Sequence, residues 1–145
     1  MYKRILVPLE NTRADAAIIR HVARLARHDG ASLVLIHVAD GFAARNIRAL
    51  NLRESEEMRK DRAYLDDMAA RLAGEGLRVD AVLGTGDPAK EIIAAADREH
   101  CDLIAMATHG HRWLKDVFFG SVAEAVRHGT LVPVLMVRQQ AEGGA

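Results

Sequence analysis

Residues 103–123 read LIAMATHGHRWLKDVFFGSVA, and this stretch decides the fold. A short apolar run, residues 103–106, leads into a loop that contains Gly110, and Gly120-Ser121 is typical of the start of a helix. The first N–H groups of a helix lack intrahelical partners and carry partial positive charge, so an anion can bind there. Gly110 and Gly120 allow the main chain to approach such an anion without a Cβ in the way. The stretch therefore predicts a strand, a phosphate-binding loop and a helix, as in parallel α/β sheets.

Four other apolar runs predict further strands: Ile5–Val7, Leu33–Val38, Val79–Leu83 and Val134–Val137. Like Leu103–Met106, they are mostly continuous rather than alternating, which is typical of a sheet covered on both faces and therefore mostly parallel. Helical segments separate the runs. Strands that alternate with helices predict a single-domain, open, doubly wound α/β fold with five parallel strands and helices on both faces.

Local signals mark the first and third helical segments. In the first, Ile18, Val22 and Leu25 recur at positions i, i+4 and i+7, and Gly30 supplies the end of the helix. The third begins at Asp87-Pro88, an N-cap residue followed by proline at the first helical position.

The second and fourth helices are predicted from apolar spacing and from glycines. The inner face of the second carries Leu65, Met68, Ala69 and Leu72. Gly74 and Gly76 end this helix. The fourth is expected to run from Ser121 to about Gly129, and Ser121 with Glu124 has the spacing of a capping box.

Length and charge indicate one domain without a broad electrostatic bias. The chain has 145 residues, with 20 Lys and Arg and 20 Asp and Glu, so its formal net charge is zero. Nucleic-acid binders and anionic-membrane binders normally need a basic excess, so neither partner is expected. We expect residues 1–140 to form the α/β domain and residues 141–145 to form a disordered tail.

The cysteine count and the N-terminus favour a cytoplasmic protein. Cys101 is the single cysteine and cannot form an internal disulfide. The N-terminal apolar run is interrupted at Pro8 and Glu10, which is too short for a signal peptide or a membrane-spanning helix. Cys101 is interpreted as an inert small residue.

Four segments come at the carboxyl ends of predicted strands. Pro8-Leu9-Glu10, Val38-Ala39-Asp40 and Gly84-Thr85-Gly86 follow the first three, and the loop that starts at Ala107 follows the fourth. Ligands of open parallel sheets bind beyond these strand ends, where the winding reverses. We expect the segments to converge on one pocket.

Five short motifs are spread along the chain: KRILVP at residues 3–8, GDPA at 86–89, THG at 108–110, GSVA at 120–123 and VPVL at 132–135. Through them the chain resembles the universal stress protein family over essentially its whole length. The nucleotide-binding branch of that family has Gly, two residues, Gly, nine residues, Gly, then Ser or Thr, and only Ala107 departs from this pattern here. The resemblance implies strand order 3-2-1-4-5, binding of ATP or another adenine nucleotide, and a homodimer through the Val134–Val137 strand.

The same resemblance implies the residues of the nucleotide site. Beside the nucleoside would lie Pro8, Leu9 and Glu10, with main-chain groups of Val38 facing adenine. The approach to ribose and phosphate would be lined by Met106, Ala107, His109 and Gly110. The phosphates, with or without Mg²⁺, would be held by Gly120, Ser121 and Val122.

Two of these residues depart from the family. Ala107 adds a methyl group, and at positive φ its strain would be on the order of 1 kcal/mol. Nucleotide binding would then be weaker by up to roughly tenfold, and Ala107→Gly is expected to tighten it. Glu10 stands where the family commonly has Asp, so the charge is kept and extended by one methylene.

Simpler interpretations stand beside the nucleotide site. Ser121 serves as a helix cap in either case, and capping is compatible with phosphate binding. His109 and His111 lie two residues apart, but no further Cys, His or Asp completes a coordination shell, so no metal site is predicted.

The leading hypothesis is an adenine-nucleotide-binding stress-response module that acts through conformational change or a regulatory protein partner. A slow ATPase is the alternative enzyme, with Glu10 or Asp40 holding Mg²⁺, although the sequence has no Walker lysine and no evident base. A third hypothesis is a dimeric scaffold that does not bind nucleotides. Pro133 supports the dimer, because proline belongs at the start or the free edge of a strand.

Overall fold

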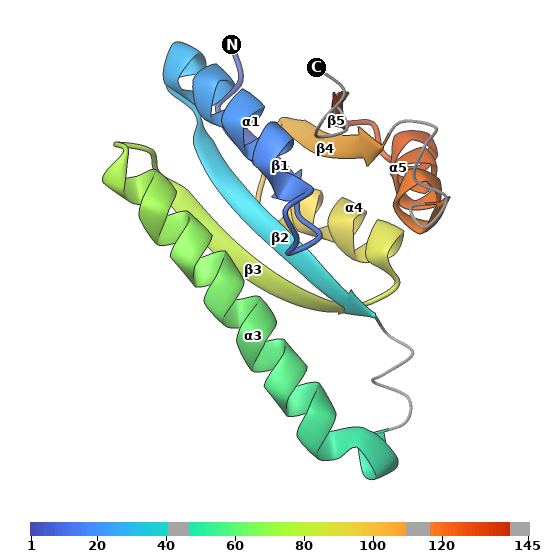
Figure 1. The fold of residues 1–145 in the computed structure, drawn as a ribbon. Coiled ribbons are helices and arrows are strands. Elements are labelled where there is room, and N and C mark those ends of the chain that lie inside the picture. The colour runs from blue at the N-terminus through green and yellow to red at the C-terminus, as the bar shows by residue number, and fades with distance from the viewer. Residues whose placement is uncertain (41–46, 110–116, 140–145) are drawn as a thin grey trace.

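The computed structural model describes residues 1–40, 47–109 and 117–139. Its elements in chain order are β1 (Arg4–Pro8), α1 (Asp15–Asp29), β2 (Ser32–Asp40), α3 (Ile47–Gly74), β3 (Val79–Gly86), α4 (Pro88–Arg98), β4 (Leu103–His109), α5 (Val117–Gly129) and β5 (Val134–Gln139). The strands form one parallel sheet in the order β3-β2-β1-β4-β5 (Figure 1). The doubly wound fold and the strand order are confirmed, whereas the expected tail, 141–145, lies outside the described residues.

The central strand is buried on both faces, which explains its continuously apolar sequence. Ile5 and Val7 of β1 belong to a core cluster with α1 and α3, whereas Leu6 belongs to a second cluster with α4 and α5. All three side chains have 0% exposure. Helices on both faces are what a parallel sheet of this kind requires. Figure 1 shows this layering, with α1 and α3 over one face of the sheet and α4 and α5 behind it.

The strands run further toward their carboxyl ends than the apolar runs predict. Parallel pairing of β2 with β3 continues through Val38 with Gly84 to Asp40 with Gly86. The prediction that the third strand ends at Leu83, before Gly84-Thr85-Gly86, is therefore wrong. Backbone pairing needs no apolar side chain, so a strand can continue beyond the end of the hydrophobic signal.

Three helix boundaries agree with their sequence signals. Gly30 ends α1 with φ 71°, a left-handed conformation that glycine adopts without strain. Asp87 is the N-cap of α4, where its side chain accepts a hydrogen bond of 3.0 Å from the N–H of Lys90, and Pro88 follows. The long helix α3 ends at Gly74. Among the described helices, none is both long and apolar enough to cross a membrane.

The start of α5 differs from the prediction. The helix begins at Val117, so Ser121 lies inside it and is not its N-cap. Glu124 does not complete a capping box, because its Oε2 accepts a hydrogen bond of 2.7 Å from Arg127. Capping signals are local, and Gly120 inside a helix costs only about 1 kcal/mol, so an upstream turn can form before the serine. The expected end at Gly129 is confirmed.

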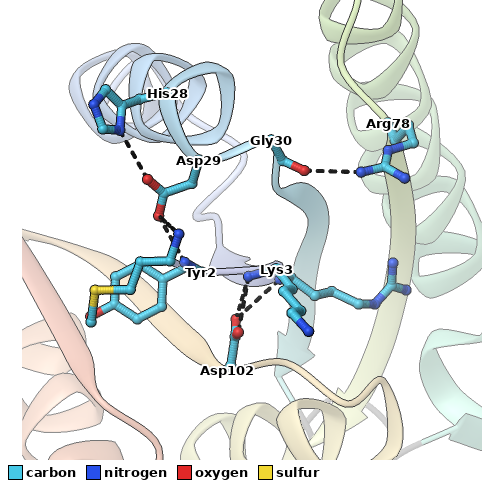
Figure 2. A network of polar contacts seen from close by, with 9 residues as sticks. Tyr2, Lys3, His28, Asp29, Gly30, Arg78 and Asp102 are labelled. Carbon is cyan, nitrogen blue, oxygen red and sulfur yellow. Dashed lines mark hydrogen bonds and ion pairs between the residues drawn. The ribbon is translucent and has the colours of Figure 1, made fainter.

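Two aspartates hold the N-terminal segment against the sheet, as Figure 2 shows. Asp29, at the end of α1, accepts a hydrogen bond of 2.8 Å from the N–H of Tyr2 and lies 3.0 Å from Nδ1 of His28. Asp102, just before β4, accepts hydrogen bonds from the N–H groups of Lys3 (2.9 Å) and Arg4 (3.0 Å). These contacts join the start of β1 to segments distant in the sequence.

The anchoring by Asp29 predicts a pH dependence of stability. The contact with His28, followed by the hydrogen bond from Tyr2, lowers the pKa of Asp29 from 3.8 to about 2. A lowered carboxyl pKa stabilises the folded state above the unfolded value, and this stabilisation is lost as the pH falls through the folded value. Between about pH 4 and pH 2, the free energy of unfolding should therefore fall more steeply in the wild type than in Asp29→Asn.

Urea unfolding at a series of pH values measures this difference, and Asp97→Asn, an exposed residue on α4, is the control. Parallel pH profiles for the wild type and Asp29→Asn would contradict the assignment.

Candidate functional site

The candidate site lies at the carboxyl edge of the sheet, where the direction of winding changes. β1 pairs with β2 on one side and with β4 on the other, so successive connections leave this point in opposite directions. Such a switch point leaves a crevice outside the strand ends in open α/β sheets. The ends of β1, β2 and β4, which carry most of the predicted nucleotide-binding residues, lie at this edge.

The predicted nucleoside residues follow β1 and β2. Pro8 is the last residue of β1, and the N–H of Leu9 donates a hydrogen bond of 2.8 Å to the carbonyl of Ile36 in β2. Leu9 is only 3% exposed, so its side chain belongs to the core. Val38 lies two residues before the end of β2 at Asp40, is partly buried, and is in register with Gly84 of β3. The structure therefore brings the end of β1 beside β2.

Met106 and Ala107 lie within β4 and are buried on opposite faces of the sheet, with exposures of 0% and 3%. Ala107 pairs with Val137 of β5 and does not have a positive φ. The expectation that its methyl group carries left-handed strain is therefore wrong, because extended backbone accepts any L-residue. His109 is the last residue of β4, and Gly110 lies outside the described residues.

The predicted phosphate residues all lie within α5. Gly120 and Ser121 are exposed, whereas Val122 is 6% exposed and packs in the same core cluster as Met106. In an α-helix that begins at Val117, the N–H groups of Ser121 and Val122 face carbonyls four residues back. The structure thus places these residues close behind the helix start rather than at it.

A buried carboxylate shapes the loop after β1. Oδ1 of Asp15 accepts a hydrogen bond of 2.9 Å from the N–H of Glu10, and Oδ2 accepts bonds from the N–H groups of Asn11 (2.9 Å) and Thr12 (3.3 Å). Asp15 is 1% exposed. Asn11 has φ 60°, a left-handed conformation that asparagine tolerates better than most residues. The loop that carries Glu10 is therefore wrapped around one charged group.

Helix α3 closes over the same carboxylate through Tyr64. Its hydroxyl donates to Oδ2 of Asp15 at 3.2 Å and lies 3.1 Å from the carbonyl of Thr12. Burial raises the pKa of Asp15, and the surrounding N–H and O–H donors oppose that change. Burial, together with the charge of Asp15, raises the pKa of Tyr64 to about 12. The phenol therefore stays protonated and available as a donor at neutral pH.

A second contact between α3 and this loop involves His37 of β2. Nδ1 of His37 lies 2.9 Å from the carbonyl of Leu9, which can only accept, so this nitrogen carries the proton. Nε2 of His37 lies 3.4 Å from Oδ2 of Asp61 on α3. The side-chain amide of Asn11 donates to Oδ1 of the same aspartate at 3.1 Å. Strand β2, the loop and α3 are thus joined in one polar network.

Sequence reasoning missed Asp15, His37, Asp61 and Tyr64 as residues that shape the site. Asp15 had a signal, because an acidic residue in the first turn of a helix is favoured by the helix dipole. The other three had none, since their roles depend on contacts between segments far apart in the sequence.

Metal binding and thiol chemistry have no support in the described residues. No group of three or more His, Cys, Asp or Glu there could hold a metal ion. Burial raises the pKa of the Cys101 thiol to about 11, so it is protonated at neutral pH and poorly nucleophilic.

The open, parallel sheet with helices on both faces and its switch point at β1 define a doubly wound α/β protein. The sequence profile of the family described as "Universal stress protein family" matches residues 1–138. The chain belongs to the universal stress protein family.

Relatives of known structure share this fold. The universal stress protein MJ0577 of Methanocaldococcus jannaschii is 27% identical over 157 residues, covering 97% of each chain. Its solved structure matches with a TM-score of 0.85 over 98% of this chain and 99% of that one. A universal stress protein in complex with cAMP has a TM-score of 0.68 and 19% identity, covering 94% of this chain and 97% of that one. The Archaeoglobus fulgidus protein in complex with dAMP has a TM-score of 0.70 and 22% identity, covering 93% and 97%.

The network around Asp15 predicts that replacing this aspartate lowers the free energy of unfolding more than replacing an exposed aspartate does. Asp15→Ala leaves three N–H groups of the loop without their acceptor, so the free energy of unfolding should fall by about 3 kcal/mol. Tyr64→Phe removes one hydroxyl, whose proton is shared between Asp15 and the carbonyl of Thr12, and should cost about 1 kcal/mol. The control is Asp66→Ala on α3, whose carboxylate is 53% exposed and pairs with Arg62, and it should change stability by less than about 0.5 kcal/mol.

Urea titration followed by circular dichroism measures all three variants. Equal losses for Asp15→Ala and Asp66→Ala would show that the buried carboxylate does not organise the loop.

Proposed function

We propose that this chain is a cytoplasmic stress-response module that binds an adenine nucleotide, with ATP preferred, and acts through conformational change or a protein partner. The observation that carries the proposal is the loop Leu9–Thr12, which the buried Asp15 holds in shape at the switch point of the sheet. A preorganised loop loses little conformational entropy when a ligand binds. Family membership supports the proposal, and so do the relatives solved with cAMP and dAMP.

The proposed site uses the residues at the strand ends according to their burial. Leu9, Met106 and Ala107 are buried, so they would contribute backbone groups and shape. Glu10, which is partly exposed, would contribute a carboxylate beside the nucleoside. Mg²⁺ in proteins is commonly held by one or two carboxylates together with the nucleotide phosphates. The cation would therefore enter with ATP rather than occupy a site of its own.

Phosphate binding at Gly120, Ser121 and Val122 requires a change in α5. Free N–H groups occur only in the first turn of a helix, which is residues 117–120 here. The N–H groups of Ser121 and Val122 would become available when that turn opens. This opening would be the conformational change linked to nucleotide occupancy, because the ligand binds the open form preferentially.

The nucleotide site is tested by placing a side chain in the proposed phosphate position. A Cβ added at Gly120 meets no described atom within 4 Å, so Gly120→Val should fold. It should weaken ATP binding by at least about tenfold, because the branched side chain blocks the approach of the phosphate to the backbone. Gly74→Val at the end of α3 is the matched control, since it also meets no described atom within 4 Å. Ala107→Gly should leave the affinity within about twofold, since it has no left-handed strain to release.

Calorimetric titration with ATP, AMP and cAMP, with and without Mg²⁺, measures these affinities, and product analysis over hours accompanies it. Saturable binding without turnover is the expected result. Turnover of ATP would identify the protein as a slow ATPase, and no binding at millimolar nucleotide would leave only the scaffold function.

We also propose a homodimer through the outer edge of β5. This strand is the last of the sheet, it begins after Pro133, and its unpaired edge can pair with a second copy around a two-fold axis. Light scattering at micromolar concentration should give twice the chain mass of 15.9 kDa. A monomer mass throughout that concentration range would refute the dimer.

A further inference from the structure

Helices α1 and α3 lie over the same face of the sheet, and a surface groove of about 480 Å³ runs between them. Figure 1 shows the two helices over this face. The groove is formed by the outward side of α1 and the last turns of α3, and neither Glu10 nor any predicted phosphate residue lines it. It is therefore separate from the nucleotide site.

The rim of the groove is basic. Arg20, Arg24 and Arg27 come from α1, Arg71 comes from α3, and Glu75 is the single acidic lining residue. Glu75 accepts a hydrogen bond of 2.9 Å from Arg27, so it neutralises only that guanidinium. The lining has four arginines and one glutamate, a net charge of +3, in a chain whose formal net charge is zero.

Two of these arginines have no internal role. Arg20 and Arg24 are exposed, and neither makes an ion pair or hydrogen bond with another described side chain. With Arg27 they recur at positions i, i+4 and i+7, which places three guanidinium groups along about 10 Å of one side of the helix. The two guanidinium groups without an ion pair, on Arg20 and Arg24, favour carboxylate or phosphate ligands.

The floor of the groove is apolar. Ile19, Ala23 and Leu72 line it and are 4%, 5% and 2% exposed, and all three belong to the core between α1, α3 and the sheet. Because these three side chains expose almost no surface, the arginines of the rim are the groups of the groove that a ligand can contact. Arginine clusters of this kind bind acidic segments through their guanidinium groups.

We propose that the groove between α1 and α3 binds an acidic segment of a partner protein, with its carboxylates on Arg20 and Arg24. The groove has no aromatic lining residue on which bases could stack, which disfavours a single-stranded nucleic acid. The inference deepens the partner-binding role proposed above, and it does not depend on nucleotide binding.

Fluorescence anisotropy with a labelled glutamate-rich peptide tests the groove in the absence of nucleotide. Arg20→Ala combined with Arg24→Ala should weaken binding by about tenfold, because two charge-assisted contacts are lost. The matched control combines Lys90→Ala and Arg98→Ala on α4, two exposed cations on the opposite face of the sheet, and should change the affinity by less than about twofold. All four side chains are exposed, so thermal unfolding should be unchanged in both variants.

Two further probes test the charge and the class of the ligand. Replacing the glutamates of the peptide by lysine should abolish saturation. An oligonucleotide of thymidines should bind more weakly than the acidic peptide. Equal binding by the two double variants, retention of binding by the lysine peptide, or tighter binding of the oligonucleotide would overturn the proposal.

Titration of the same two double variants with ATP distinguishes failure of the groove proposal from failure of the proposed nucleotide function. Loss of peptide binding with unchanged ATP binding supports the groove as a separate site. If the wild type binds ATP but shows no saturable binding of the peptide, the groove inference fails while the proposed nucleotide function stands.

Discussion

The structure depends on the burial of β1 between two layers of helices. Ile5 and Val7 face α1 and α3, and Leu6 faces α4 and α5, so one short strand contributes to both cores. Because β1 also pairs with β2 and β4, its backbone groups are satisfied inside the sheet. The switch point of the sheet lies at this strand, and the position of the ligand edge follows from it.

The loop after β1 has a fixed conformation at this edge of the sheet. A loop beside a buried strand would leave N–H groups without partners, and the Asp15 carboxylate accepts three of them. Tyr64 and Asp61 then tie α3 to the loop, so the long helix that covers one face of the sheet also limits the motion of the edge. The same helix forms one wall of the basic groove through Arg71, which places two proposed binding functions on one element.

Most of the fold could be predicted from the sequence, and the candidate site could be predicted only in part. The apolar runs, Gly30 and Asp87-Pro88 are local signals, and each element they indicate is present. The predicted end of β3 and the predicted start of α5 are wrong, since backbone pairing and helix extension continue where no side-chain signal requires them. The expectation of strain at Ala107 is also wrong. Its φ depends on whether β4 continues past Met106, and β4 continues to His109.

The class of fold and the segments that reach the carboxyl edge follow from local sequence, because periodicity, capping and turn residues act over a few neighbouring positions. The family was indicated separately, by the resemblance of five short motifs. The burial of Asp15 beneath the loop, the contact of His37 with Asp61 and the groove that the arginines of α1 border with α3 depend on tertiary packing. These contacts join residues that lie tens of positions apart, and nothing in the local sequence specifies which distant side chains packing brings together.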